Sequence, residues 1–331
     1  MIARREFISL LGGAAAAWPL AARAQQQPAM RRLGVLMNGS EDDPIMRRYL
    51  AAFEQPLRPL GWTERQNIHI DRRWTAGDPE RTRLYAPELV ALAPDAILSL
   101  SSSNLRALQR ETRTIPIVFA LVSDPVAQGF VASLAQPNGN ITGLSAYEFS
   151  IGGKWVDLLK QLAPGLAQVG LLFNPDVSIQ SREFMHSIEA TAPSFGVNAV
   201  ALPVRSSDEL ETTIAAVARQ SNAGLIVPTD QFLSVRRKLL IDLVAKHRIP
   251  TIYAQPDYVS DGGLISYGTD QAEQLRKAAI YVDRILRGAK PGDLPIQNPT
   301  KFNCVINLKT VGTMGMDVPL GLLLNADEVI E

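Results

Sequence analysis

The feature that most constrains the fold is a regular alternation, from Arg31 onward, of short β-branched or apolar runs with amphipathic stretches. This alternation is typical of α/β proteins with parallel sheets. The runs predict two series of strands. The first series comprises Leu33–Met37, Ile68–Trp74, Ala96–Leu100, Ile117–Val122 and Ile141–Ser145. The second comprises Val169–Phe173, Val197–Pro203, Gly224–Val227, Thr251–Tyr253 and Leu264–Tyr267.

Two strand series of similar size predict two doubly wound, Rossmann-like lobes joined by a hinge of several strands. We expect the chain to cross between the lobes near residues 142–148, 268–270 and 295–301. The predicted lobe 1 comprises residues 31–144 and about 269–298, and the predicted lobe 2 comprises residues 145–268 and about 299–331. No sequence repeat supports the division, so one large sheet is the alternative.

The first 24 residues have the pattern of an export signal. Arg4 and Arg5 form a charged region, residues 8–20 form a short apolar run, and residues 22–24 offer small side chains to a signal peptidase. The sequence RREFI, which starts at Arg4, resembles a twin-arginine signal, and an ordinary secretory signal is the alternative. By either route we expect a periplasmic protein whose mature chain begins near Gln25.

Composition argues against several classes of function. Without the three arginines and one glutamate of residues 1–24, 30 basic and 32 acidic residues remain, a net charge of −2. Nucleic acid is therefore not an expected partner, because phosphate contacts need a clustered positive surface. No apolar run after the signal is long enough to span a bilayer, so we do not expect a membrane-embedded protein. Cys304 is the only cysteine, so no intramolecular disulfide can form.

Motifs for catalysis or metal binding are absent from the sequence. The three histidines lie in unrelated segments without the spacing of a metal site. Neither a Gly-x-Ser-x-Gly elbow nor a Walker A loop is present. We therefore expect no cofactor, no metal and no catalytic residue.

Polar residues follow five of the predicted strands, where doubly wound sheets bind their ligands. Hydroxyls and backbone N–H groups at a helix start suit a carboxylate, and an aspartate on the facing lobe suits an ammonium group. The same residue types are preferred helix N-caps, so capping is the alternative for each. The segments are Asn38-Gly39-Ser40, Ser101-Ser102-Ser103-Asn104, Ser123-Asp124-Pro125, Asn174-Pro175-Asp176 and Pro228-Thr229-Asp230. Phe119 is a candidate for stacking on a ligand, with core packing as its alternative.

Several short sequences, spaced along nearly the whole mature chain, carry a family resemblance. They are SDPV at 123–126, GFVASLA at 129–135, GNITG at 139–143, PTD at 228–230, GLISYG at 263–268, PTKF at 299–302, INLKT at 306–310 and ADEVI at 326–330. With them the chain resembles the ABC-transporter substrate-binding family that includes the tryptophan- and phenylalanine-binding lipoproteins. The resemblance implies the type I periplasmic binding fold.

The resemblance also implies a function without chemical reaction. The lobes would close on a small organic ligand, an amino acid or a similar carboxylate, and deliver it to an ABC permease in the inner membrane. It implies that the cleft is faced by Asn38, the Ser101–Asn104 loop, Asp124, Ser145, Asn174 and Asp230. We expect a monomer. A ligand-sensing protein for a membrane receptor and an exported α/β enzyme are the alternatives.

One departure from the family pattern concerns the ligand. The family has a Thr-Pro or Thr-Ala pair after the third strand, where this chain has a run of serines from Ser101 to Ser103. Additional hydroxyls favour a more polar ligand or more water in the cleft. The amino-acid specificity therefore does not follow from the resemblance.

Overall fold

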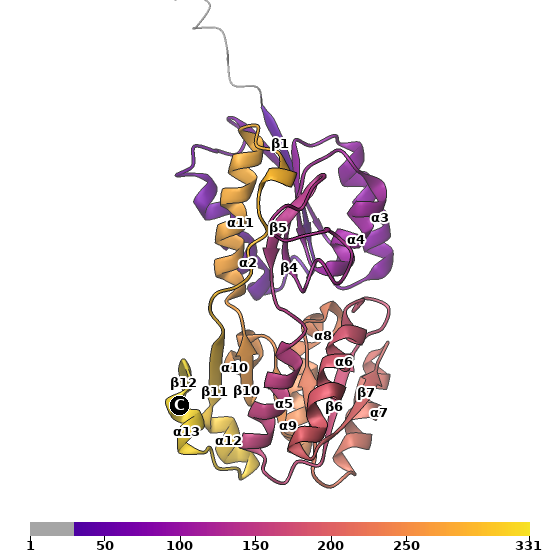
Figure 1. The fold of residues 1–331 in the computed structure, drawn as a ribbon, viewed down its shortest axis with the longest axis vertical. Helices are drawn as coiled ribbons and strands as arrows, with labels where there is room; N and C mark the ends of the chain where they lie inside the picture. Colours follow the sequence, from indigo (N-terminus) through magenta and orange to yellow (C-terminus); the bar gives the residue numbers. More distant parts are fainter. Residues whose placement is uncertain (1–29) are drawn as a thin grey trace, which may run out of the picture.

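The structure is a computed structural model that describes residues 30–331. The predicted export signal lies outside the described residues. The described chain forms two α/β lobes arranged end to end along the long axis of the molecule (Figure 1). Each lobe has its own sheet, so the predicted α/β fold with two lobes is confirmed, and the alternative of a single large sheet is wrong.

Lobe 1 is built on a parallel sheet in the order β2-β1-β3-β4-β5. Its strands are β1 (Arg31–Met37), β2 (Ile68–Trp74), β3 (Ala96–Leu100), β4 (Ile117–Val122) and β5 (Ile141–Ser145). One face packs against α2 (Pro44–Glu54) and α11 (Gln271–Leu286), and the other against α3 (Pro79–Ala91) and α4 (Ser102–Glu111) (Figure 1). Because helices cover both faces, β3 and β4 are buried throughout and are mostly apolar.

Lobe 2 is built on a sheet in the order β12-β11-β10-β9-β8-β6-β7, in which only the β10–β11 pair is antiparallel among the described strands. Its strands are β6 (Gln168–Phe173), β7 (Asn198–Pro203), β8 (Ala223–Val227), β9 (Thr251–Tyr253), β10 (Ile265–Gly268), β11 (Asn303–Asn307) and β12 (Glu328–Ile330). One face packs against α5 (Ile151–Leu162) and α6 (Ser181–Thr191), and the other against α7 (Ser207–Ala218) and α9 (Arg237–His247).

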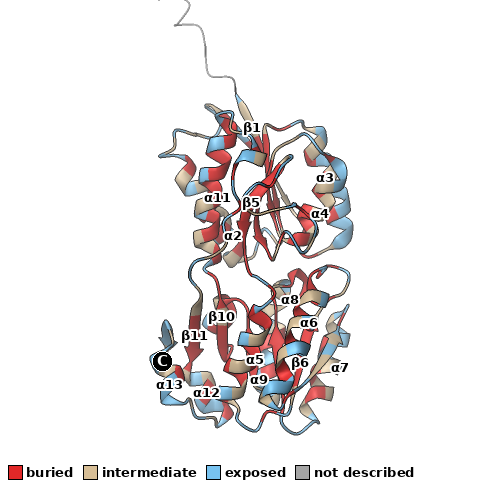
Figure 2. Ribbon diagram, viewed as in Figure 1, coloured by how far each residue is buried: buried red, intermediate tan, exposed pale blue. Residues whose placement is uncertain are grey.

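Shorter helices complete both lobes. They are η1 (Gln55–Leu57) and η3 (Pro291–Asp293) in lobe 1, and η2 (Ala192–Phe195), α8 (Gln231–Val235), α10 (Pro256–Ser260), α12 (Leu308–Met314) and α13 (Leu320–Leu324) in lobe 2. Figure 2 shows that the central strands of both sheets are buried, whereas the edge strands β7 and β12 and the outer faces of the helices are intermediate or exposed. Within residues 30–331, no helix is both long enough and apolar enough to span a bilayer.

The two lobes share one strand order, because β7-β6-β8-β9-β10 repeats the order β2-β1-β3-β4-β5. In doubly wound sheets a crevice forms where the strand order reverses, at the carboxyl ends of the strands. The reversal lies between β1 and β3 in lobe 1 and between β6 and β8 in lobe 2. Residues that follow β1, β3 and β8 line one cavity, so the carboxyl ends of both sheets are directed toward the junction of the lobes.

Three segments connect the lobes (Figure 1): one from β5 to α5, one from β10 to α11, and one from η3 to β11. The first and third are hydrogen-bonded to each other, because Ser145 N donates to Gln297 O at 2.9 Å and Gln297 N donates to Gly143 O at 3.3 Å. The second returns the chain to lobe 1, where α11 packs beside α2. We propose lobe boundaries at the predicted positions, with residues 269–298 in lobe 1 and 299–331 in lobe 2.

Candidate functional site

A small cavity of about 20 Å³ lies between the lobes. Eleven of the thirteen residues that line it are polar, and Leu121 and Val177 are the apolar ones. A space of this size holds about one water molecule, so an amino acid would require the lobes to separate first and to close around it afterwards. The cavity is the candidate ligand site because it lies where two crevices of doubly wound sheets meet.

The lobe 1 wall of the cavity is the start of α4. Ser101 is the N-cap of this helix, and its Oγ accepts from the backbone N of Asn104 at 3.4 Å. Its φ of 81° lies in the left-handed region, which residues other than glycine rarely adopt. Ser102 is buried, and Ser103 also lines the cavity. The helix start therefore presents hydroxyls and backbone N–H groups to the space between the lobes.

Gln231 of lobe 2 contacts this wall directly. Its Nε2 donates to Ser101 Oγ at 2.6 Å, and Ser103 Oγ donates to its Oε1 at 2.9 Å. One amide thereby joins the two lobes through the hydroxyls that the sequence predicts to bind a carboxylate. A ligand carboxylate at the same hydroxyls would have to replace the amide of Gln231.

Asp230 lines the cavity from lobe 2 and is 3% exposed. It is the N-cap of α8, with Oδ1 accepting from Leu233 N at 2.9 Å and Oδ2 accepting from Asn174 N at 2.7 Å. Burial raises the pKa of this carboxyl to about 6, although the backbone N–H donors act in the opposite direction. The capping alternative is thus observed, in a residue that also faces the cavity.

A second set of contacts closes the lobes beside the cavity. Asp257, on α10 of lobe 2, accepts hydrogen bonds from Arg48 and Tyr49 of α2 in lobe 1. The carboxylate is 8% exposed, and Tyr49 is buried too. Arg237 of α9 lies 3.6 Å from Asp43 of lobe 1. We call the contact of Asp257 with Arg48 and Tyr49 the rim contact, and the contact of Gln231 with the serines the central contact.

The cavity brings together five of the ten predicted site residues: Asn38, Ser101, Ser102, Ser103 and Asp230. The other five have different surroundings. Asn104 is fully buried and donates to Leu36 O of β1 at 3.2 Å. Phe119 is fully buried in the apolar core between the sheet and α3 and α4.

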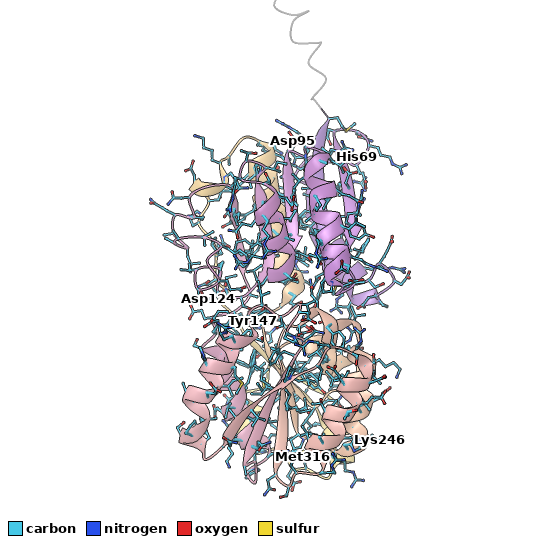
Figure 3. The ribbon with its side chains drawn as sticks, turned by 90° about the vertical axis from the view of Figure 1, so that its right-hand side faces the viewer. His69, Asp95, Asp124, Tyr147, Lys246 and Met316 are labelled. Carbon is cyan, nitrogen blue, oxygen red and sulfur yellow. The ribbon has the colours of Figure 1, made fainter. Side chains whose placement is uncertain are left out.

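The remaining predicted residues lie near the junction without lining the cavity. Asp124 accepts from Ala127 N at 3.0 Å and so closes its own turn. Figure 3 shows it at the level between the lobes, whereas His69 lies toward the outer end of lobe 1. Ser145 is on the first crossing segment, and Asn174 is held through its backbone N by Asp230.

Sequence reasoning missed the glutamines of the site. Gln231, Gln255 and Gln271 line the cavity and lie within four residues after the ends of β8, β9 and β10. Gln180, at the start of α6, also lines it. The rule that polar residues after strands face the ligand would have found the first three, had the segment after β8 been extended one residue beyond Asp230 and had the rule been applied after β9 and β10.

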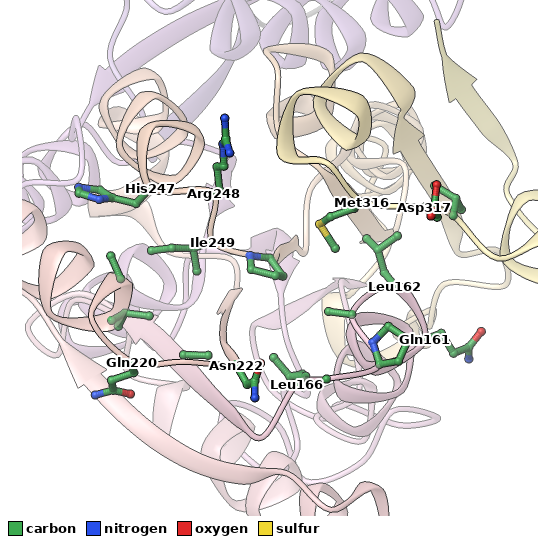
Figure 4. A pocket seen from close by; sticks show the side chains of 18 of the residues that line it. Gln161, Leu162, Leu166, Gln220, Asn222, His247, Arg248, Ile249, Met316 and Asp317 are labelled. Carbon is green, nitrogen blue, oxygen red and sulfur yellow. The ribbon is translucent and has the colours of Figure 1, made fainter.

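A larger cavity of about 660 Å³ lies at the outer end of lobe 2 (Figure 4). Its walls include Asn222, Arg248 and Met316, and Figure 3 places Met316 far from the junction. It lies at the amino ends of β8 and β9. None of the described residues that line it has a buried side-chain nitrogen or oxygen without a hydrogen-bond partner. Among residues 30–331, no cluster of His, Cys, Asp or Glu could hold a metal ion. The cavity between the lobes is therefore the better candidate.

Comparisons with known proteins find a matching family and several similar proteins. A family described as ABC transporter substrate binding protein matches residues 33–330. The chain is 27% identical over 275 residues to a tyrosine-binding protein of Clostridioides difficile (strain R20291), covering 83% of this chain and 79% of that protein.

Two solved structures are similar over 91% of the chain. A conserved domain protein of Vibrio cholerae has a TM-score of 0.84 and 26% identity, and 99% of it is covered. An ABC domain in complex with L-Trp from Streptococcus pneumonia has a TM-score of 0.81 and 25% identity, and all of it is covered. The fold is that of the type I periplasmic binding proteins.

Proposed function

Since the chain belongs to the ABC transporter substrate-binding protein family, whose model matches residues 33–330, we propose that it captures an amino acid or a similar carboxylate for an ABC importer. The family is one of solute-binding proteins and not of enzymes. The ligand would bind between the lobes, and a permease in the inner membrane would receive it. The observation that carries the proposal is the polar cavity where the two sheets meet.

Closure of the lobes is the proposed mechanism of capture. The rim contact and the central contact both join residues of different lobes, so both are made only when the lobes are together. A ligand held by both walls would leave the rim contact in place, replace the central contact with its own contacts, and shift the population toward the closed arrangement. The permease would then distinguish closed from open protein.

The proposed ligand class rests on the two walls of the cavity. Ser101 and Ser103 at the start of α4 suit a carboxylate, and the buried carboxylate of Asp230 suits an ammonium group. Relatives described as a tyrosine-binding protein and as a complex with L-Trp support an amino acid. We also propose export to the periplasm through the signal at residues 1–24.

A thermal-shift screen of amino acids and short-chain acids tests the proposal. A ligand at 100 times its Kd adds about 2.7 kcal/mol to the free energy of unfolding. Small-angle scattering with the same ligand should show a smaller radius of gyration, because closure brings the lobes together. Uptake of the ligand by cells with and without the protein then tests the importer.

Two variants test which of the two cavities the ligand occupies. Ser103→Phe puts a bulky ring between the lobes and should abolish the thermal shift. Gly165→Phe puts the same ring in the outer cavity of lobe 2 and should leave the shift unchanged. The opposite pattern, or a radius of gyration that stays the same with saturating ligand, would contradict binding between the lobes.

A further inference from the structure

Three side-chain amides that line the cavity carry buried atoms without a hydrogen-bond partner among the described residues. Gln271, the first residue of α11, is 2% exposed, and neither its Oε1 nor its Nε2 has a partner. Gln180, which is 7% exposed, has an unpartnered Oε1, and Asn38 has an unpartnered Oδ1. Buried polar atoms are normally hydrogen-bonded, so three exceptions around one cavity need a physical explanation.

The groups that surround these amides determine which of their donor and acceptor atoms remain available to a ligand. Gln180 Nε2 donates to Thr229 O at 2.9 Å, which leaves its Oε1 as an acceptor toward the cavity. Tyr147 lies close to Gln271, but its hydroxyl donates to Ala254 O at 2.7 Å. The Tyr147 hydroxyl can still accept from one N–H of the Gln271 amide, which leaves the second N–H and Oε1, so Gln271 presents a donor and an acceptor together.

The rest of the lining limits the charge and polarity of a ligand. Among the residues that line the cavity, Asp230 is the only ionisable one, and no lysine or arginine is present. A ligand with a second carboxylate would find no cation for it. An aromatic side chain would press an apolar ring against the amides and leave their atoms unpaired, whereas a polar side chain would satisfy them.

Building on the proposed function, we propose that Gln271, with Gln180 and Asn38, recognises the side chain of the ligand, and that this ligand is a neutral polar amino acid. Its side chain both donates and accepts hydrogen bonds, as a primary amide does. The α-carboxylate and ammonium group are left to the start of α4 and to Asp230. Gln271 is then a specificity-determining residue, and its position is fixed by the first turn of α11.

Calorimetric titration of the purified protein tests this assignment with L-glutamine, L-asparagine, L-glutamate, L-tyrosine and L-tryptophan as probes. We expect L-glutamine or L-asparagine to bind at least about tenfold more tightly than L-glutamate, L-tyrosine and L-tryptophan. Gln271→Met, which keeps the length and removes both polar atoms, should weaken amide binding about tenfold or more. Without added ligand its melting temperature should stay the same or rise, because two unpaired buried atoms are removed.

Gln274→Met is the matched control on the same helix. Gln274 is 6% exposed and does not line the cavity; its Nε2 donates to Thr269 Oγ1 at 2.9 Å, while its Oε1 has no partner among the described residues. This variant leaves the buried hydroxyl of Thr269 without its donor, so it should lower the melting temperature and leave ligand affinity unchanged. If Gln271→Met melts as early as Gln274→Met, Gln271 is structural and the assignment is wrong.

The outcomes separate this inference from the proposed function. Binding of tyrosine or tryptophan at least as tight as that of the amides, with lobe closure, would overturn the inference and leave the capture of an amino acid standing. Absence of binding by every probe would overturn the ligand class. The proposed function itself would be contradicted if no solute that gives a thermal shift also reduces the radius of gyration in small-angle scattering.

Discussion

Two buried carboxylates of lobe 2 face lobe 1, and they are satisfied in different ways. Asp257 accepts from the side chains of Arg48 and Tyr49, which belong to the opposite lobe. Asp230 accepts from backbone N–H groups of its own lobe, and no described side chain donates a hydrogen bond to it. Asp257 therefore loses its partners when the lobes separate, whereas Asp230 keeps its own.

Because of this difference, the rim and the centre of the cleft have different roles. Burial raises the pKa of Asp230 to about 6, because its backbone N–H donors only partly compensate for the loss of water. A ligand cation in the cavity would supply the missing charge. We infer that Asp257 sets how readily the lobes close and that Asp230 responds to what lies between them.

Replacing Asp257 with alanine should give the largest effect, because it removes the acceptor shared by Arg48 and the buried Tyr49. Removing one partner of a buried charged contact costs about 3 to 5 kcal/mol, and the lower end applies because Arg48 is 56% exposed and can rehydrate. A loss of about 3 kcal/mol from the closed arrangement weakens ligand affinity roughly 150-fold. Calorimetric titration measures it.

Asp242→Ala serves as the control for this variant. Asp242 lies on α9 of the same lobe, is 63% exposed, and pairs only with Lys238 within that helix at 3.1 Å among the described residues. Its removal should leave affinity unchanged. If Asp257→Ala binds ligand as the unmodified protein does, the rim contact does not govern closure.

Much of the fold was predictable from the sequence because each strand carries its own signal. All ten predicted strands are present, with ends within two residues of their predicted positions. β11 and β12 were missed. β11 contains Asn303, Cys304 and Asn307 between a proline-containing crossing and a short helix, and β12 has only three residues, so neither shows a long apolar run.

The site was only half predictable, because residue type after a strand does not fix the direction of a side chain. Ser101 and Asn104 both lie at the start of α4, yet one faces the cavity and the other turns back to Leu36 O. Gln271 follows a strand of lobe 2 but starts a helix of lobe 1, and only the crossing of the chain brings it to the cavity. Such placement depends on tertiary structure.

Asp230→Asn should have the next largest effect, seen in the pH dependence of stability. Since the folded pKa of about 6 exceeds the ordinary value of 3.8, the folded state holds its proton more tightly than the unfolded chain. The stability from this group is fully present below pH 4 and is lost as the pH rises through 6. At 1.36 kcal/mol for each pH unit between the two pKa values, the loss is on the order of 3 kcal/mol.

Urea unfolding at several pH values measures this difference. The stability of the unmodified protein relative to Asp230→Asn should fall between pH 4 and 6 and stay constant above about pH 7. A difference that does not change with pH would mean that Asp230 is ionised throughout, and that the backbone N–H donors of Asn174 and Leu233 are sufficient for it.

Gln231→Ala should give the smallest effect, with the opposite sign to Asp257→Ala. The central contact joins the lobes as the rim contact does, but it uses the hydroxyls of Ser101 and Ser103 that we assign to the ligand carboxylate. A ligand must displace the amide, and a neutral hydrogen bond contributes about 0.5 to 1.5 kcal/mol. Removing the amide should therefore strengthen ligand binding about two- to tenfold in a calorimetric titration, mainly by freeing both hydroxyls. Weaker binding would instead place Gln231 in contact with the ligand, and the carboxylate would have to bind elsewhere along the start of α4.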